Sequence, residues 1–249
     1  MTEPSKQKEE TGFAIIHLLP NALTITAICA GLSAIRFGVQ GNYVLAVQLI
    51  IAACVLDGLD GRIARLLSSD SKLGAELDSL ADFLNFGVAP PLVLYFWALQ
   101  DIRSAAWIAV LFFAVCCVMR LARFNVGGKS ETCDQDKAYF EGVPAPAGAL
   151  LVMLPMYLSF AFANAPLLPS IVICLYMVII GLLLISRIST WSFKTTRISR
   201  ENAKFFLIGV AVVGAALLTF AWATLIALCF GYVGMVAWAW IDREVPSNR

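Results

Sequence analysis

The chain has 249 residues, of which 60% are hydrophobic and only 14% are charged. Soluble domains carry about 25% charged residues, so this composition excludes an ordinary soluble globular protein and indicates lipid as the solvent. The net charge of +1 gives no bulk attraction to nucleic acid.

A transmembrane helix needs about 20 mostly apolar residues. We therefore predict an all-α integral membrane protein with eight spans at about residues 20–38, 43–66, 78–99, 104–124, 144–163, 167–186, 205–221 and 223–241. The apolar residues 12–19 are predicted either as a short interfacial helix or as an extension of the first span. Pro20 and Asn21 are explained locally as the first residue and the cap of that span.

The Lys and Arg residues predict the orientation. With a cytoplasmic N-terminus, 16 of the 18 Lys and Arg side chains fall on the inner side, and only Arg36 and Arg103 fall outside. An even number of spans then puts both termini in the cytoplasm. In a bacterium this is the inner membrane, and the polar ends of the second and third spans face the cytoplasm.

The predicted domain organisation follows the same pattern. A cytoplasmic tail with the possible interfacial helix covers residues 1–19, and a six-helix core covers residues 20–186. A basic cytoplasmic loop at 187–204, an additional transmembrane hairpin at 205–241 and a tail at 242–249 complete the chain.

Cysteine and histidine chemistry receives little support from the sequence. The seven cysteines form no CxxC pair, and all but Cys133 lie in apolar runs, so we interpret them as small buried hydrophobic residues. His17 is the one histidine of the chain, which argues against histidine-based metal sites and triads.

Four aspartates are placed where a bilayer makes them costly. Asp57 and Asp60 follow the long apolar run of the second span, and Asp78 and Asp82 open the third. An Asp at the centre of a membrane helix costs about 2.5–3.5 kcal/mol on insertion scales. Charges kept in such positions usually face a polar cavity and have a function.

Helical spacing places these aspartates in two groups. At about 100° per residue, one side of the second span carries Asp57, Asp60, Gly61 and Ala64. A stripe of residues four apart on the next helix consists of Gly74, Asp78 and Asp82. We therefore expect two pairs of carboxylates to face each other across a helix hairpin.

Clustered carboxylates repel one another unless cations neutralise them. Oxygen ligands favour Mg²⁺ or Mn²⁺, and two such ions bridge a pyrophosphate well. Arg65 adds a cation for the phosphates. The alternative is that the aspartates cap helices and pair with Arg62, Arg65 and Lys72 in a cytoplasmic loop.

The stretch from residue 57 to residue 82 resembles the signature of the CDP-alcohol phosphatidyltransferase family. That signature reads Asp, two residues, Asp-Gly, two residues, Ala-Arg, about eight residues, Gly, three residues, Asp, three residues, Asp. All its fixed positions are present: Asp57, Asp60, Gly61, Ala64, Arg65, Gly74, Asp78 and Asp82.

The resemblance implies a six-helix membrane core, usually in a homodimer, that transfers a phosphatidyl group from a CDP-linked lipid to an alcohol and releases CMP. It implies two divalent cations held by Asp57, Asp60, Asp78 and Asp82, with Asp82 also acting as general base. The CDP-binding residues it implies are Gly61, Ala64, Arg65 and Gly74, with Asn21 and Thr24 as further candidates.

Two further regions, residues 120–147 and 186–194, resemble the bacterial membrane-embedded (type II) phosphatidylserine synthases of this family. The resemblance implies L-serine as acceptor and CDP-diacylglycerol as donor. Arg120 and Arg123 are predicted to bind the serine carboxylate, and Asn125 to add a hydrogen bond. The alternative is that the two arginines only anchor their helix at the inner interface.

Two other functions stay open at this point. In the first, the same transfer uses glycerol 3-phosphate, an inositol phosphate or another alcohol as acceptor. A phosphorylated acceptor needs additional cations in the pocket. In a different class of protein, a cation or proton transporter, the aspartates form a relay. The glycines and the Ala-Arg pair have no clear role in a transporter.

Overall fold

A computed structural model describes residues 6–67, 71–129, 139–141, 143–162, 166–186, 189–191 and 203–244. In these residues the protein is helical except for one pair of three-residue strands. The chain divides into two compact units, Met1–Gln100 and Asp101–Arg249.

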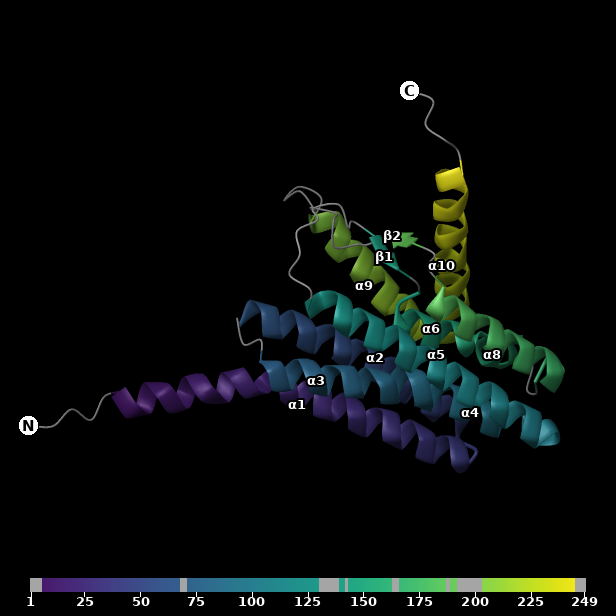
Figure 1. Cartoon of the computed structure of the whole chain (residues 1–249), viewed down its shortest axis with the longest axis horizontal. Helices are drawn as coiled ribbons and strands as arrows, with labels where there is room; N and C mark the ends of the chain where they lie inside the picture. Colours follow the sequence, from purple (N-terminus) through teal and green to yellow (C-terminus); the bar gives the residue numbers. More distant parts are fainter. Residues whose placement is uncertain are drawn as a thin grey trace, which may run out of the picture. The chain divides into compact units, whose positions relative to one another are not determined.

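The first unit is a bundle of helices that run alongside one another (Figure 1). The first helix, α1, packs against α2, α3 and α4. The elements in chain order are α1 (Lys6–Val39), α2 (Tyr43–Leu66), α3 (Lys72–Asp82), the π-helical segment η1 (Phe83–Val88) and α4 (Ala89–Ala98).

The connection between α1 and α2 is a tight turn. Gly41 has φ of 80°, a left-handed conformation that glycine adopts without a Cβ penalty. Asn42 then caps α2, because its side chain accepts a hydrogen bond from the Leu45 amide at 3.3 Å. The chain reverses in three residues, so α1 and α2 lie antiparallel.

Small residues allow α1 to approach its neighbours closely. Its buried face carries Ala27, Gly31, Ala34 and Gly38 at spacings of three and four. A methyl group on Gly38 would lie 3.2 Å from Cγ2 of Val93 in α4. Lipid gives no hydrophobic drive between helices, so such close packing holds this bundle together.

Two expectations about the N-terminal region need correction. Pro20 lies inside α1, which begins at Lys6, so Pro20 does not start the helix and Asn21 does not cap it. Proline removes one backbone hydrogen bond, and membrane helices tolerate that loss. Residues 12–19 extend the first span as a continuous helix, and no separate interfacial helix precedes it within the described residues.

The third span begins earlier than its apolar run predicts. The Oγ of Ser71 accepts a hydrogen bond from the Gly74 amide at 2.9 Å and caps α3. The helix then continues through η1 to Ala98. Hydropathy misses the first two turns because they are polar, although Ser71 is a normal capping residue.

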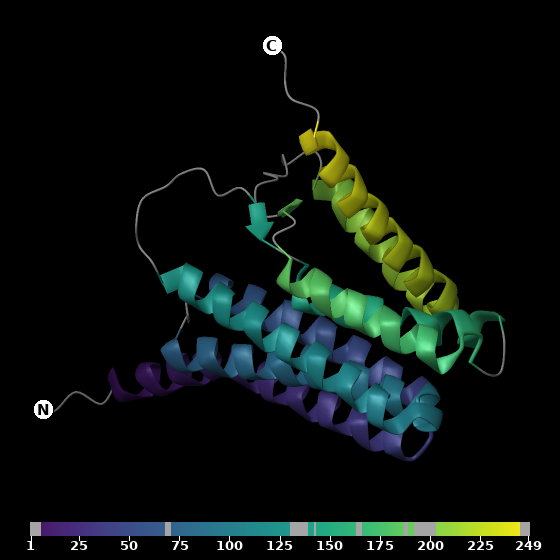
Figure 2. The same ribbon diagram turned by 45° about the vertical axis from the view of Figure 1, so that its right-hand side comes forward.

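The second unit contains six helices, α5 (Arg103–Lys129), α6 (Ala145–Val152), α7 (Leu154–Phe162), α8 (Ser170–Ile185), α9 (Ala203–Thr219) and α10 (Ala221–Glu244). A short 3-10 turn at Gln100–Ile102 precedes α5. Helices α9 and α10 follow each other directly in the chain and contact each other (Figure 2). Strands β1 (Tyr139–Glu141) and β2 (Ser189–Trp191) pair in antiparallel fashion.

All eight predicted spans fall on helices, and two of these helices are shorter than the usual span of about 20 residues. Five helical segments pass by length and apolar composition, and α6 with α7, bent by 41°, makes a sixth. Helices α8 and α9 have 16 and 17 residues, whereas about 20 residues span the hydrocarbon core. The protein is thus a multi-pass helical membrane protein, with five or six spans that pass this length and composition test in the described residues.

The cysteines behave largely as predicted. Six lie in described residues and all six are free, with Cys116, Cys117 and Cys229 buried. Cys29 is exposed, contrary to the expectation of burial. Cys133 lies outside the described residues.

Candidate active site

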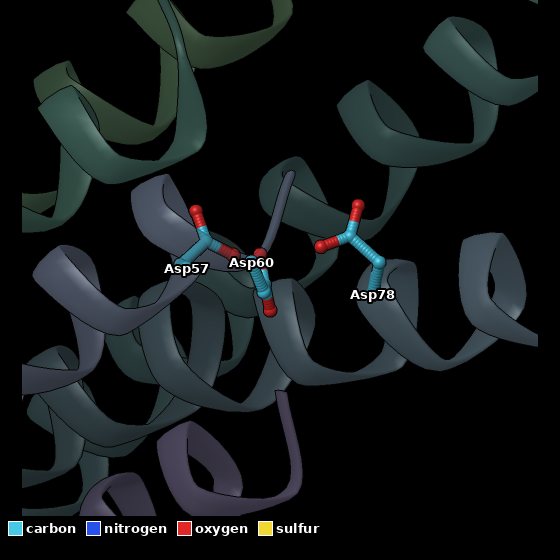
Figure 3. Close-up of side chains that lie close together, drawn as sticks. All are labelled: Asp57, Asp60 and Asp78. Carbon is cyan, nitrogen blue, oxygen red and sulfur yellow. The ribbon is translucent and has the colours of Figure 1, made fainter. Parts of the chain in front are cut away.

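The aspartates of α2 and α3 converge as their spacing predicts. Asp57 and Asp60 on α2 and Asp78 on α3 point their carboxyl groups toward one another (Figure 3). One carboxylate oxygen from each lies within 4.8 Å of the other two. Asp60 is buried, with 3% of its surface exposed. Asp57 remains partly accessible, so the cluster can be reached from outside.

Asp82 belongs to the same cluster. It lies one turn after Asp78, and its carboxyl group is within hydrogen-bonding range of that of Asp57. Two carboxyl groups approach this closely only when a proton or a cation is shared between them. The two pairs therefore face each other across the α2–α3 hairpin.

The alternative interpretation of the aspartates as helix caps is wrong. The caps of α2 and α3 are Asn42 and Ser71. Arg65 donates its Nε to the Gly61 carbonyl at 2.9 Å, so this nitrogen is used within its own helix. The carboxylates are grouped for a reason other than capping.

Helix α1 supplies a hydrogen bond to the cluster. Thr24 is buried, and its Oγ1 lies 2.5 Å from Oδ2 of Asp60 and 3.1 Å from the Pro20 carbonyl. The single hydroxyl proton is better used on the carboxylate, because charge-assisted hydrogen bonds are stronger. The other oxygen, Oδ1 of Asp60, is buried and has no hydrogen-bond partner among the described residues.

These features fit a hard divalent cation. The donors are carboxylate oxygens, which suit Mg²⁺ or Mn²⁺, and the buried Oδ1 of Asp60 lacks a donor that would compete. A cation between Asp57, Asp60 and Asp78 would remove their mutual repulsion. The structure therefore supports metal binding here without distinguishing the two ions.

Two glycines of the predicted nucleotide site have different surroundings. A methyl group on Gly74 would lie 3.0 Å from Oδ1 of Asn21 and 3.0 Å from Oγ of Ser71. A methyl group on Gly61 would have no neighbour within 4 Å. Asn21 is thus brought to Gly74, one turn before Asp78, and Gly61 borders open space beside Asp60.

The residues predicted to bind serine lie in the other unit. Arg123 donates its Nη1 to the carbonyl of Ile185, the last residue of α8, at 3.0 Å. Arg120 is half-buried. Asn125 lies one turn further along α5 and is half-buried as well.

The two further regions of resemblance meet in this unit. Strands β1 and β2 lie next to each other (Figure 1). In this pair, Phe140 lies opposite Thr190 and Glu141 opposite Ser189. The bond from Arg123 to Ile185 brings the end of α5 to the chain just before β2. Three stretches that are far apart in the sequence are therefore neighbours.

The sequence analysis missed Asn85. This residue is fully buried in η1, three positions after Asp82, and its amide has no hydrogen-bond partner among the described residues. Its side chain occupies the space that a side chain on Gly31 would need. Burying a polar amide in an apolar span is costly, so the presence of Asn85 in the third span was a sequence signal for this residue.

A family model described as CDP-alcohol phosphatidyltransferase matches residues 17–241. The chain belongs to the CDP-alcohol phosphatidyltransferase family, which confirms the resemblance of residues 57–82. This match covers both units and includes all four aspartates of the cluster.

Several curated relatives carry the name CDP-diacylglycerol--serine O-phosphatidyltransferase. The one from Mycobacterium leprae (strain TN) is 41% identical over 202 residues, which are 81% of this chain and 67% of that protein. The one from Helicobacter pylori (strain 26695) is 35% identical over 193 residues, 78% of each chain. The match to the one from Mycobacterium tuberculosis (strain H37Rv) is 46% identical over 150 residues, 60% of this chain and about half (52%) of that protein.

Proposed function

We propose that this protein transfers the phosphatidyl group of CDP-diacylglycerol to L-serine, which yields phosphatidylserine and CMP. The observation that carries the proposal is the cluster of Asp57, Asp60 and Asp78 with Asp82 beside it, on a chain of this family. Serine is the acceptor named for the relatives from M. leprae and H. pylori.

In the proposed reaction, the serine hydroxyl attacks the phosphorus that carries diacylglycerol. The bond from this phosphorus to the CMP oxygen breaks, and CMP leaves with the electron pair. Asp82 takes the hydroxyl proton, as a carboxylate next to the reacting oxygen can. The anhydride is already activated, so positioning and a base supply most of what the reaction needs.

The carboxylates would hold two divalent cations, Mg²⁺ or Mn²⁺, which neutralise the pyrophosphate and the leaving CMP. Thr24 fixes the orientation of Asp60 through its hydrogen bond. The CDP moiety would lie along the open space next to Gly61. Its other contacts would come from Ala64, Arg65, Gly74, Asn21 and Thr24.

Serine would be recognised by its carboxylate. Arg120 and Arg123 would make this contact, and Arg123 would share its guanidinium between serine and the Ile185 carbonyl. Asn125 would add a hydrogen bond from the same helix. An arginine–carboxylate pair is strong and directional, which favours serine over acceptors without a carboxylate.

We further infer that the protein is a homodimer in the inner membrane, with both termini and the active site on the cytoplasmic side. The distribution of 16 of 18 Lys and Arg residues supports this orientation. Donor and acceptor then meet at the interface, where the lipid comes from the bilayer and serine from the cytoplasm.

One assay tests the proposed function. Purified protein is incubated with CDP-diacylglycerol, Mn²⁺ or Mg²⁺ and a panel of alcohols, and CMP release is followed. We expect release with L-serine that chelation abolishes and added cation restores. Release with glycerol 3-phosphate but not serine would support the other acceptor class. No release with any alcohol would refute the enzyme and leave the transporter.

A further inference from the structure

The third span changes its helical geometry immediately after Asp82. The segment η1, Phe83–Val88, is π-helical, and the amide of Ala89 donates to the carbonyl of Leu84, five residues earlier. A π turn holds one residue more than an α turn, and single π turns inside α-helices are frequent at functional sites. The position of η1, directly after the last aspartate, points to a role in the metal site.

The extra residue changes which side chains share a face. In a continuous α-helix, Phe86 would follow Asp78 and Asp82 on the same face at the next step of four. Through η1, the residue one turn after Asp82 is Gly87, five positions on. Compared with a continuous α-helix, α3 is thus rotated against α4 by about 100°, the angle of one residue. This rotation lets α4 pack on α1 while Asp78 lies with the aspartates of α2.

The sequence after Asp82 opposes a regular α-helix. Pro90 and Pro91 lie in the first turn of α4, and in an α-helix a proline ring clashes with the carbonyl four residues earlier. The two carbonyls concerned, those of Phe86 and Gly87, lie within η1. The prolines explain why α-helical geometry ends here, but they do not determine how η1 is placed against α1.

Asn85 fixes η1 against α1. Its side chain is fully buried, and neither Oδ1 nor Nδ2 has a hydrogen-bond partner among the described residues. A Cβ on Gly31 would overlap Oδ1 and would lie 3.1 Å from Cγ of Asn85. Oδ1 therefore faces the Cα of Gly31, whose hydrogen is a weak donor. A buried amide without a stronger partner is costly, so stability alone does not account for Asn85.

We propose that Asn85 is a positioning residue of the metal site. Packed against Gly31, it holds η1 in its π-helical geometry, and η1 sets the rotation that brings the carboxylates of Asp78 and Asp82 to those of α2. Because its side chain is enclosed by protein, Asn85 acts through the backbone of η1 and not as a metal ligand. The inference rests on the proposed metal site and not on the identity of the acceptor alcohol.

The test measures Mn²⁺ binding by the full chain in nanodiscs, from the electron paramagnetic resonance signal of free Mn²⁺, without CDP-lipid or serine. Gly31→Ala displaces the Asn85 side chain. The matched control is Gly38→Ala, two turns further along α1, where the methyl group would meet Cγ2 of Val93 in α4 at 3.2 Å. The double variant Gly31→Ala/Asn85→Ala removes the overlap.

We expect the Kd for Mn²⁺ to rise at least about tenfold in Gly31→Ala and at least about threefold in Asn85→Ala, as for other residues that orient metal ligands. Gly38→Ala should raise it less than about twofold, because α4 holds no ligand. The double variant should bind within about threefold of the wild type, since two changes that act through one contact are not additive. Melting temperatures check that each variant is folded.

Equal Kd values in the two glycine variants would overturn the proposal. A double variant whose Kd rises by the product of the two single effects would overturn it as well. If Gly31→Ala is not folded, Asn85→Ala decides, and a Kd equal to that of the wild type refutes the positioning role. No Mn²⁺ binding by the wild type would instead refute the proposed metal site, and this inference with it.

Discussion

The carboxylates of α2 and α3 face one another, whereas the arginines near the end of α5 face other groups. Oδ1 of Asp60 is buried without a hydrogen-bond donor, and Asp82 approaches Asp57 within hydrogen-bonding range. Arg123, by contrast, donates a hydrogen bond to the carbonyl of Ile185, the last residue of α8. Stability alone does not favour grouped acids in a membrane helix pair, but it does favour an arginine at a helix end. The acids therefore report function more directly than the arginines.

The largest effect is expected from Asp82→Asn. The amide keeps the size of the side chain but cannot take the serine proton, so turnover should fall by about 10²–10⁴-fold. Nucleotide binding should change by less than about threefold, because three carboxylates remain for the cations. CMP release and titration with a CDP analogue measure the two quantities separately.

Glu76→Gln is the control for this experiment, since Glu76 is an exposed acid of α3 outside the aspartate cluster. It should leave both turnover and binding near the wild-type values. If Asp82→Asn loses nucleotide binding completely, Asp82 only holds metal and the general base must be sought elsewhere.

A second prediction concerns the repulsion within the cluster. Asp78→Asn removes one of three charges whose oxygens lie within 4.8 Å of one another. The metal-free protein should therefore become more stable by about 1 kcal/mol, or about 2–4 °C in melting temperature. The stabilisation by added Mn²⁺ should shrink, and the concentration needed should rise at least about tenfold.

Thermal unfolding with and without Mn²⁺ measures both effects, and Glu76→Gln should show neither. A metal-free Asp78→Asn protein that is less stable than the wild type would contradict the cluster as a site of repulsion. The carboxylates would then be held by partners other than a cation.

A third prediction concerns the two arginines of α5. Arg120→Ala should raise the KM for serine by about 10- to 100-fold, the loss expected for a charge-assisted hydrogen bond to a carboxylate. Arg123→Ala should raise it less and should also lower the melting temperature, because the Ile185 carbonyl loses its donor. Equal effects of the two variants on KM would argue against this division of roles.

Much of the site was predictable from the sequence because it depends on local periodicity. Residues four apart on a helix share a face whatever the surroundings, so the stripe of Asp78 and Asp82 followed from spacing alone. Two helices joined by a short link are antiparallel neighbours, so their facing carboxylates followed as well.

The rest depends on tertiary contacts that no local pattern contains. The hydrogen bond from Thr24 to Asp60 joins residues 36 positions apart, and the spacing of α1 did not predict it. Pro20 was assigned to a helix start because proline usually stands there, yet α1 passes through it. Helix α8 is shorter than the span predicted over residues 167–186, because the apolar residues Leu167 and Leu168 extend the run beyond the helix.

The smallest expected effects come from two glycines of the same signature, Gly61 and Gly74. Alanine in place of a helical glycine stabilises by up to about 1 kcal/mol when space allows. Gly61→Ala has that space, so we expect a higher melting temperature and a KM for CDP-diacylglycerol raised about threefold to tenfold by the narrower nucleotide space. Gly74→Ala places its methyl group 3.0 Å from Asn21 and Ser71, so the gain should be cancelled or reversed.

Melting temperatures measured without CDP-diacylglycerol, together with KM values for it, separate two roles of a signature glycine. One role is to leave space for the ligand, and the other is to allow close packing. If a glycine leaves space for the ligand, its replacement by alanine should make the protein more stable and raise the KM for CDP-diacylglycerol. If a glycine allows close packing, its replacement by alanine should make the protein less stable whether or not the ligand is bound. If Gly61→Ala is stabilised and its KM is unchanged, the open space next to Asp60 is not where CDP binds, and the nucleotide must approach the aspartates from the side of Asn21.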